Sequence, residues 1–144
     1  MKNITILTSS PPATAATLSA FEAKHNIQLP TAYKKFLMEM NPRTIKEQVF
    51  QKEHREFWIH RFFAFDKGYE LSFQSTYQAM EAHFENKYIA FALDPGSWMF
   101  VISIKKEDYG QVYFCRMDEE LEEALTFLAD DFESFLEGLF IFAR

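Results

Sequence analysis

The 144-residue chain has few of the residues that usually carry special chemistry. Its single cysteine, Cys115, excludes an internal disulfide and any metal site built from several cysteines. There are 15 Lys and Arg against 21 Asp and Glu, a formal charge of −6, and no long basic run. This balance argues against nucleic acid or an anionic membrane as the default partner. The first apolar run is too short for a signal peptide, and no stretch reaches the roughly 18 uncharged apolar residues of a spanning helix. We therefore expect a cytoplasmic location.

Glycine and proline are also scarce, with four and five copies, so each is expected to mark a boundary between elements. Aromatic side chains are abundant instead, with 17 Phe and an aromatic share of 17%. A chain of this length forms one domain as a rule and buries roughly 70% of its unfolded surface. We expect an N-terminal leader over residues 1–13 and a single domain with an aromatic core over residues 14–144.

The clearest pattern is a set of three apolar runs over residues 88–93, 98–104 and 111–117, rich in β-branched and aromatic residues. Turn residues separate the runs, with Asp94-Pro95-Gly96-Ser97 in the first gap. Connections this short join antiparallel neighbours, because a parallel pair needs a crossover of a dozen or more residues. The sequence therefore predicts an antiparallel meander around which the other elements pack.

The rest of the chain predicts four helices and two further strands. Apolar residues at helical spacing predict helices over residues 14–25, 30–41 and 72–86, and a closing helix over 130–140 that begins with an Asp130–Glu133 capping box. An aromatic run predicts a strand over residues 56–65, and residues 44–52 indicate one irregular strand. Periodicity leaves residues 119–129 open, as a continuation of the closing helix or as extended chain.

Three segments in this order carry a resemblance to a known family. They are Leu29-Pro30-x-x-Tyr33-x-x-Phe36-Leu37 with Asn41 after it, then residues 89–96 continuing to Gly110-x-Val112-Tyr113, and residues 129–136. Together they resemble the SUKH superfamily, specifically its Smi/Knr type. The resemblance implies an α+β domain with a mainly antiparallel sheet flanked by helices. Members often have Asn-Gly after the second helix and a second glycine in the loop after Asp94, where this chain has Asn41-Pro42 and Ser97-Trp98.

The resemblance also implies a binding protein without a shared catalytic apparatus, so we expect no enzyme activity and no cofactor. Many bacterial members resemble immunity proteins that block toxins, often nucleases, and fungal members are regulators of cell-wall assembly. The leading hypothesis is an immunity-like inhibitor of a basic toxin domain. The alternative is a regulatory adaptor in cell-wall, glucan or envelope synthesis, and the oligomeric state stays open.

The candidate partner-binding residues follow from charge and from aromatic anchors. The acidic run over residues 118–123, after the meander, attracts and orients a basic partner through its charge, or else is simply a solvated face. Trp98, next to a turn, is an interface anchor or else a core residue that alternates with Phe100. The four histidines lie on different predicted elements, so no metal site is expected. Cys115 is expected to be a small buried hydrophobe. The candidates are Asp94, Trp98, Asp118, Glu119, Glu120 and Glu123.

Overall fold

The computed structural model describes residues 4–143, so residues 1–3 of the expected leader and residue 144 lie outside the described part. The helices are α1 (Ala15–His25), α2 (Thr31–Glu39), α3 (Phe73–Ala79), α4 (Glu81–Phe84), α5 (Leu121–Ala124) and α6 (Phe132–Glu137), with a short 3-10 helix η1 (Lys106–Asp108). The strands are β1 (Ile6–Ser9), β2 (Pro42–Ile45), β3 (Val49–Lys52), β4 (Arg55–Trp58), β5 (Arg61–Phe62), β6 (Tyr88–Leu93), β7 (Met99–Ser103), β8 (Val112–Cys115), β9 (Leu125–Ala129) and β10 (Leu139–Phe140). The predicted α+β class is confirmed.

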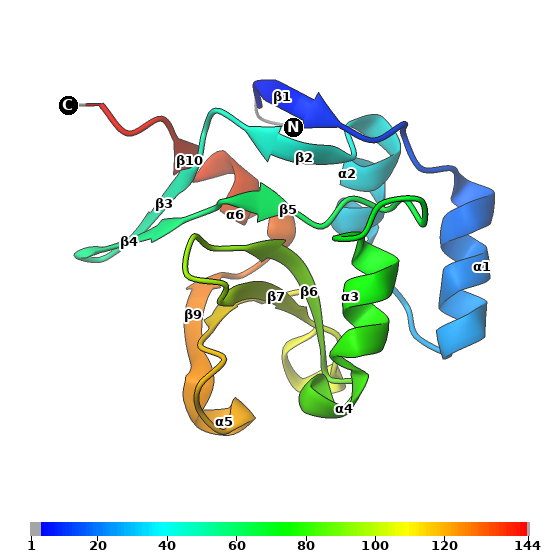
Figure 1. Cartoon of the computed structure of the whole chain (residues 1–144). Coiled ribbons are helices and arrows are strands. Elements are labelled where there is room, and N and C mark those ends of the chain that lie inside the picture. The colour runs from blue at the N-terminus through cyan, green and yellow to red at the C-terminus, as the bar shows by residue number, and fades with distance from the viewer. Residues whose placement is uncertain (1–3, 144) are drawn as a thin grey trace.

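The largest sheet has the strand order β5-β6-β7-β8-β9, and every neighbouring pair is antiparallel (Figure 1). The predicted meander is therefore confirmed as β6, β7 and β8. In register across one end of this sheet lie Leu93, Met99, Cys115 and Leu125. The turn over residues 94–98 and the connection over residues 116–124 consequently leave the sheet at the same end.

Two smaller antiparallel sheets, β1-β2 and β10-β3-β4, complete the strands of the described chain. The prediction of one strand over residues 56–65 is wrong, because the run divides between two sheets. The amide of Ile59 donates to Gln48 O at 2.7 Å, beside β3, whereas the next amide, His60, donates to Leu93 O at 2.8 Å, beside β6. Residues 44–52 likewise contain the end of β2 and all of β3 rather than one irregular strand.

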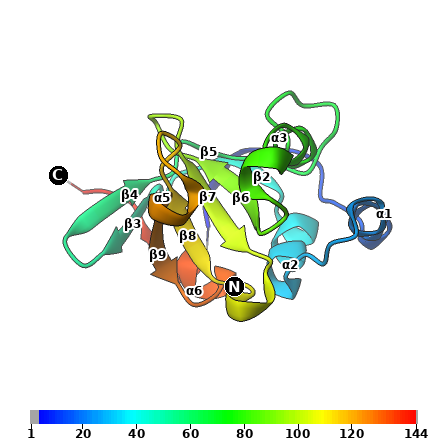
Figure 2. The same ribbon diagram turned by 90° about the horizontal axis from the view of Figure 1, so that it is seen from below.

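Helices cover both faces of the main sheet. Phe91 and Phe100 pack against α6 through Phe132 and Phe135, with ring centroids 5.2 Å and 5.8 Å apart respectively. On the other face, α3 and α4 lie against β6. Figure 1 shows α6 and α5 on opposite sides of the main sheet, and Figure 2 shows α1 at the margin of the molecule, outside α2 and α3. The core is therefore aromatic, as the composition predicts.

The helix boundaries follow capping chemistry. Thr14 begins α1 and accepts a hydrogen bond from Thr17 N at 3.1 Å, and Ser72 begins α3. The predicted helix over residues 72–86 divides at Met80 into α3 and α4. The predicted capping box at Asp130 is wrong, because the N-cap is Asp131, whose carboxylate accepts from Ser134 N at 2.7 Å. Of residues 119–129, which periodicity left open, 121–124 form a separate helical turn and 125–129 form a strand, so the closing helix does not extend back over them.

Asn41 joins three separate parts of the chain. Its side chain is fully buried; Nδ2 donates to Pro11 O at 2.8 Å and to Phe65 O at 3.0 Å, and Oδ1 accepts from Phe65 N at 2.8 Å. Its backbone has φ of 45°, in the left-handed region that asparagine tolerates better than most residues. Asn41 thereby ties residues 10–13 and the β5–α3 loop to the end of α2.

Candidate functional site

The acidic run leaves the main sheet after β8 and returns through α5 to β9. Leu121 and Ala124 stand three positions apart on one side of α5, and both are buried. Glu122 and Glu123 are exposed, because helical residues between such a pair point away from the buried side. One helical turn with an apolar side thus holds the carboxylates on the surface.

A groove of about 740 Å³ separates this segment from α4. Figure 1 places α4 and α5 together on the same side of the main sheet. His83 of α4 lines the groove, and its Nε2 is buried without a hydrogen-bond partner among the described residues. We name this feature the acidic groove because six carboxylate residues line it: Glu85, Asp118, Glu119, Glu120, Glu122 and Glu123.

Arg116 neutralises part of the acidic groove. Its guanidinium donates two hydrogen bonds to Glu119 Oε2, and Nη2 also donates to Glu123 O at 2.7 Å. These contacts brace the connection between β8 and α5. An exposed ion pair of this kind contributes about 1 kcal/mol or less to stability, so its main effect is to occupy the Glu119 carboxylate.

Lys87 supplies the second cation. Its Nζ lies 3.2 Å from Glu85 Oε1 and 3.9 Å from Glu122 Oε1, so one lysine joins the two walls of the groove. Six carboxylates against two cations leave four negative charges uncompensated. Three exposed carboxylates have no ion pair within residues 4–143: Asp118, Glu120 and Glu123.

Asp94 shapes the turn between β6 and β7. Its Oδ1 accepts from Gly96 N at 2.9 Å and from Trp98 N at 2.8 Å. Ser97 in this turn has φ of 72°, a conformation that favours glycine. The resemblance leads to the expectation of a second glycine in this loop, and Ser97 has a backbone conformation that glycine would adopt readily. The Asp94 carboxylate therefore has a structural role whatever it binds.

Trp98 is half-buried, so part of its ring packs in the core and part is accessible to a partner. Its ring meets Phe114 at 6.0 Å between centroids in an edge-to-face arrangement. Because neighbouring strand residues alternate between faces, Trp98 shares the α6 side with Phe100 and Phe114. The structure thus brings four predicted residues into the acidic groove. Asp94 and Trp98 lie at the same end of the sheet, but the Trp98 ring is on the α6 face and the groove is on the opposite face. The binding role of all six stays a prediction.

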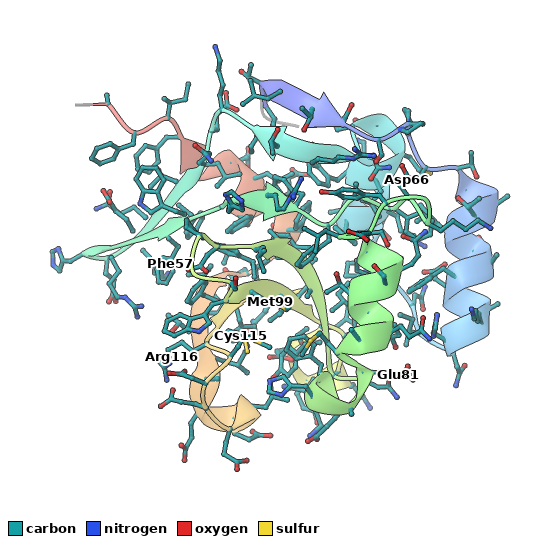
Figure 3. The ribbon with its side chains drawn as sticks, viewed as in Figure 1. Phe57, Asp66, Glu81, Met99, Cys115 and Arg116 are labelled. Atoms are coloured by element: carbon teal, nitrogen blue, oxygen red, sulfur yellow. The ribbon has the colours of Figure 1, made fainter. Side chains whose placement is uncertain are left out.

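Two further features of the described chain bear on its chemistry: Cys115 and the side chains of metal-binding type. Cys115 is fully buried beside Met99 (Figure 3), and burial raises the pKa of its thiol to about 11, although Arg116 opposes the shift. A thiol in that state is a poor nucleophile at neutral pH. Across residues 4–143 no group of three or more His, Cys, Asp or Glu residues could hold a metal ion. None of the helices in that part of the chain has the length and apolar character needed to cross a bilayer.

Sequence reasoning missed two groove-lining residues, His83 and Glu85, and Lys87, which pairs with carboxylates of both walls. They lie far from the acidic run in sequence, and no local pattern connects the two segments. Only the packing of α4 and α5 on one face of the sheet brings them together. The signal that was available, a dense run of carboxylates, located one wall of the groove and not the other.

Comparison with known proteins agrees with the sequence motifs. No curated protein matches the chain. The family model described as SMI1 / KNR4 family (SUKH-1) matches residues 12–138, a range that contains the acidic groove, the Asp94–Trp98 turn and Asn41. The resemblance expected from three short motifs is thereby confirmed over most of the chain, and the protein belongs to the SMI1 / KNR4 (SUKH-1) family.

Proposed function

We propose that this protein is a non-catalytic, immunity-like inhibitor that binds a basic toxin domain through the acidic groove. Membership of the family supports an immunity-like or regulatory role at the level of the family. The choice of an inhibitor with a basic target rests on this chain's own surface.

The observation that carries the proposal is the concentration of unpaired negative charge in one concave surface. Asp118, Glu120 and Glu123 are exposed and unpaired within the described chain. They line a groove wide enough, at about 740 Å³, to admit side chains of another protein. Complementary charge accelerates encounter and orients docking more than it adds affinity, so this surface favours a basic partner. A nuclease toxin must carry a basic surface for the phosphate backbone and has the required complementarity.

Trp98 extends the proposed interface past the groove. The turn over residues 94–98 and the acidic connection leave the sheet at the same end, from neighbouring strands about 4.8 Å apart. An interface of standard size covers about 800 Å² on each partner, enough to include both. In this proposal the partner reaches around this end of the sheet onto the α6 face, where Trp98 is an aromatic anchor and Asp94 holds the turn that carries it.

The test is capture of partners from the native cell with the wild-type protein and two variants. The first variant reverses the unpaired carboxylates, with Asp118→Lys, Glu120→Lys and Glu123→Lys. Glu119 stays, because it is held by Arg116. The control variant carries Glu53→Lys, Glu56→Lys and Glu70→Lys, three exposed positions outside the groove that change the net charge equally.

Capture of a basic, toxin-like protein by the wild type and the control, and its loss from the first variant, is the expected result. Equal capture by all three proteins would show that the acidic groove is only a solvated face. Capture of envelope-synthesis proteins instead would replace the inhibitor by a regulatory adaptor.

A further inference from the structure

We infer that a second groove, beside α1, binds a short segment of a partner protein that carries apolar side chains flanked by carboxylates. This groove has a volume of about 440 Å³ and lies between α1, residues 11–13 and the β5–α3 loop. It shares no lining residue with the acidic groove, so the inference goes beyond the proposed function. We name it the α1 groove.

One wall of the α1 groove is a single face of the helix. Thr17, Ala20, Phe21 and Lys24 follow helical spacing and all line the groove. The opposite wall is the start of the β5–α3 loop, where Asp66 lies near α1 (Figure 3). Figures 1 and 2 both show α1 at the edge of the molecule, and three residues of its groove-lining face, Thr17, Ala20 and Lys24, are exposed.

The floor of the α1 groove is apolar. Phe21 and Phe65 meet edge to face, with centroids 5.7 Å apart, and form its base. Pro12 and Ala20 are exposed above them. Apolar side chains of a partner would be removed from water here, which is the usual source of affinity in a groove of this size.

The loop wall and residues 11–13 are fixed before any partner arrives. Residues 11–13 are held by the bond from Asn41 Nδ2 to Pro11 O at 2.8 Å and by the bond from Ala13 N to Leu37 O at 3.0 Å. The loop is held by the two bonds between Asn41 and Phe65 and by Asp66 N donating to Gln74 Oε1 at 3.1 Å. Because these segments are already ordered, binding a partner here loses little conformational entropy in the groove.

Charge decides which segment fits. Lys24 and Lys67 line the groove, are exposed, and have no ion pair within residues 4–143. The nearby carboxylate of Asp66 is occupied by Gly68 N and by Arg43 Nη2, at 3.1 Å and 3.4 Å. The rim is therefore positive on a chain whose net charge is −6. Two lysines are too few to hold a nucleic-acid backbone, and an apolar floor offers phosphates nothing. Carboxylates flanking apolar residues complement both features.

The test uses a synthetic peptide, acetyl-Glu-Glu-Leu-Ala-Leu-Glu-Glu-amide, titrated into the full ¹⁵N-labelled protein and followed by amide chemical shifts. The control peptide has lysine in place of every glutamate. Expected shift changes are confined to α1, residues 11–13 and residues 65–67, and the lysine peptide produces none. Changes centred elsewhere, equal binding of both peptides, or no change at millimolar peptide would overturn the inference.

Three protein variants separate charge from shape. Lys24→Glu with Lys67→Glu is expected to weaken binding about tenfold, whereas Lys46→Glu with Lys106→Glu, exposed positions outside the groove, changes the net charge equally and leaves binding as it was. Ala20→Arg is expected to abolish binding by filling the groove, even though it adds a positive charge. Phosphatidylglycerol vesicles are the last arm: binding to them that the Lys24/Lys67 variant loses, without binding of the peptide, would assign the groove to a membrane surface instead.

Discussion

Replacing Asn41 with alanine tests how one side chain holds the end of α2, the N-terminal segment and the β5–α3 loop together. The substitution removes three hydrogen bonds, two to the backbone of Phe65 and one to Pro11 O. The amide and carbonyl of buried Phe65 lose these partners inside the fold. Alanine must also adopt φ of 45°, which costs an L-residue other than asparagine or glycine roughly 1 kcal/mol or more.

The expected loss is about 4 kcal/mol. A buried backbone group left without a partner costs about 1–3 kcal/mol, and Phe65 has two of them. Loss of the hydrogen bond to Pro11 O lowers the free energy of unfolding less, because Pro11 is exposed and water can replace the bond. Backbone conformation adds about 1 kcal/mol. Against a total stability of about 5–15 kcal/mol for a domain, this single change is severe.

Urea unfolding of four variants separates the two contributions. Asn26 has nearly the same backbone conformation, φ 52°, but is exposed and has no side-chain hydrogen bond within the described residues. Asn26→Ala should therefore lose only the conformational part, about 1 kcal/mol. Asn41→Gly and Asn26→Gly remove the side chains without the conformational cost. If Asn41→Ala proves no more destabilising than Asn26→Ala, the three hydrogen bonds do not stabilise the fold and the reasoning fails.

Three further substitutions test other parts of the structure. Burial alone would raise the pKa of Asp108, but hydrogen bonds from Lys105, Ser103 and Tyr113 hold that pKa below its ordinary 3.8. Asp108→Asn should lower the free energy of unfolding by about 2–3 kcal/mol at pH 7. A carboxylate with a lowered pKa in the folded state stabilises the fold only when it is ionised. The difference between wild type and variant in urea unfolding should therefore shrink as the pH falls below about 4. A cost that is unchanged down to pH 2 would contradict the ionised assignment. Ser97→Gly should raise the free energy of unfolding by up to about 1 kcal/mol, and with it the thermal midpoint, because Ser97 has φ of 72°. A lower thermal midpoint would refute the idea that the Ser97 backbone is strained. Gly138→Ala should destabilise by about 1–3 kcal/mol, because a Cβ there would lie 2.6 Å from Phe50 Cε1. Gly68→Ala, whose Cβ would meet nothing closer than Asp66 Oδ1 at 3.5 Å, is the matched control, and equal losses in the two would argue against the clash.

Sequence patterns predicted the elements whose signals are local. The meander could be predicted because turn residues separate its β-rich runs, and α1 and α3 because Thr14 and Ser72 are N-caps that stand before apolar residues at helical spacing. The strand expected over residues 56–65 failed because a change of partner leaves no local signal. Ile59 bonds to one sheet and His60 to another, with aromatic residues continuing on both sides of the change.

The candidate site shows the same limit. The run after Met117 was visible as a concentration of carboxylates, and one wall of the acidic groove follows from it. The second wall could not be predicted, because His83 and Glu85 reach the groove through the packing of α4 on the sheet. The division between α5 and β9 was also hidden, since periodicity over residues 119–129 does not distinguish a helix from extended chain. Tertiary contacts with β8 decide it.

The central claim is that the acidic groove binds a basic protein partner. Its most direct test is the association rate of the captured partner with the wild type, the Asp118/Glu120/Glu123 reversal and the Glu53/Glu56/Glu70 control, measured over a range of salt concentrations. The account predicts a rate for wild type and control that falls steeply with salt, and a slower, nearly salt-independent rate for the reversal. The same rate and the same salt dependence in all three proteins would contradict it.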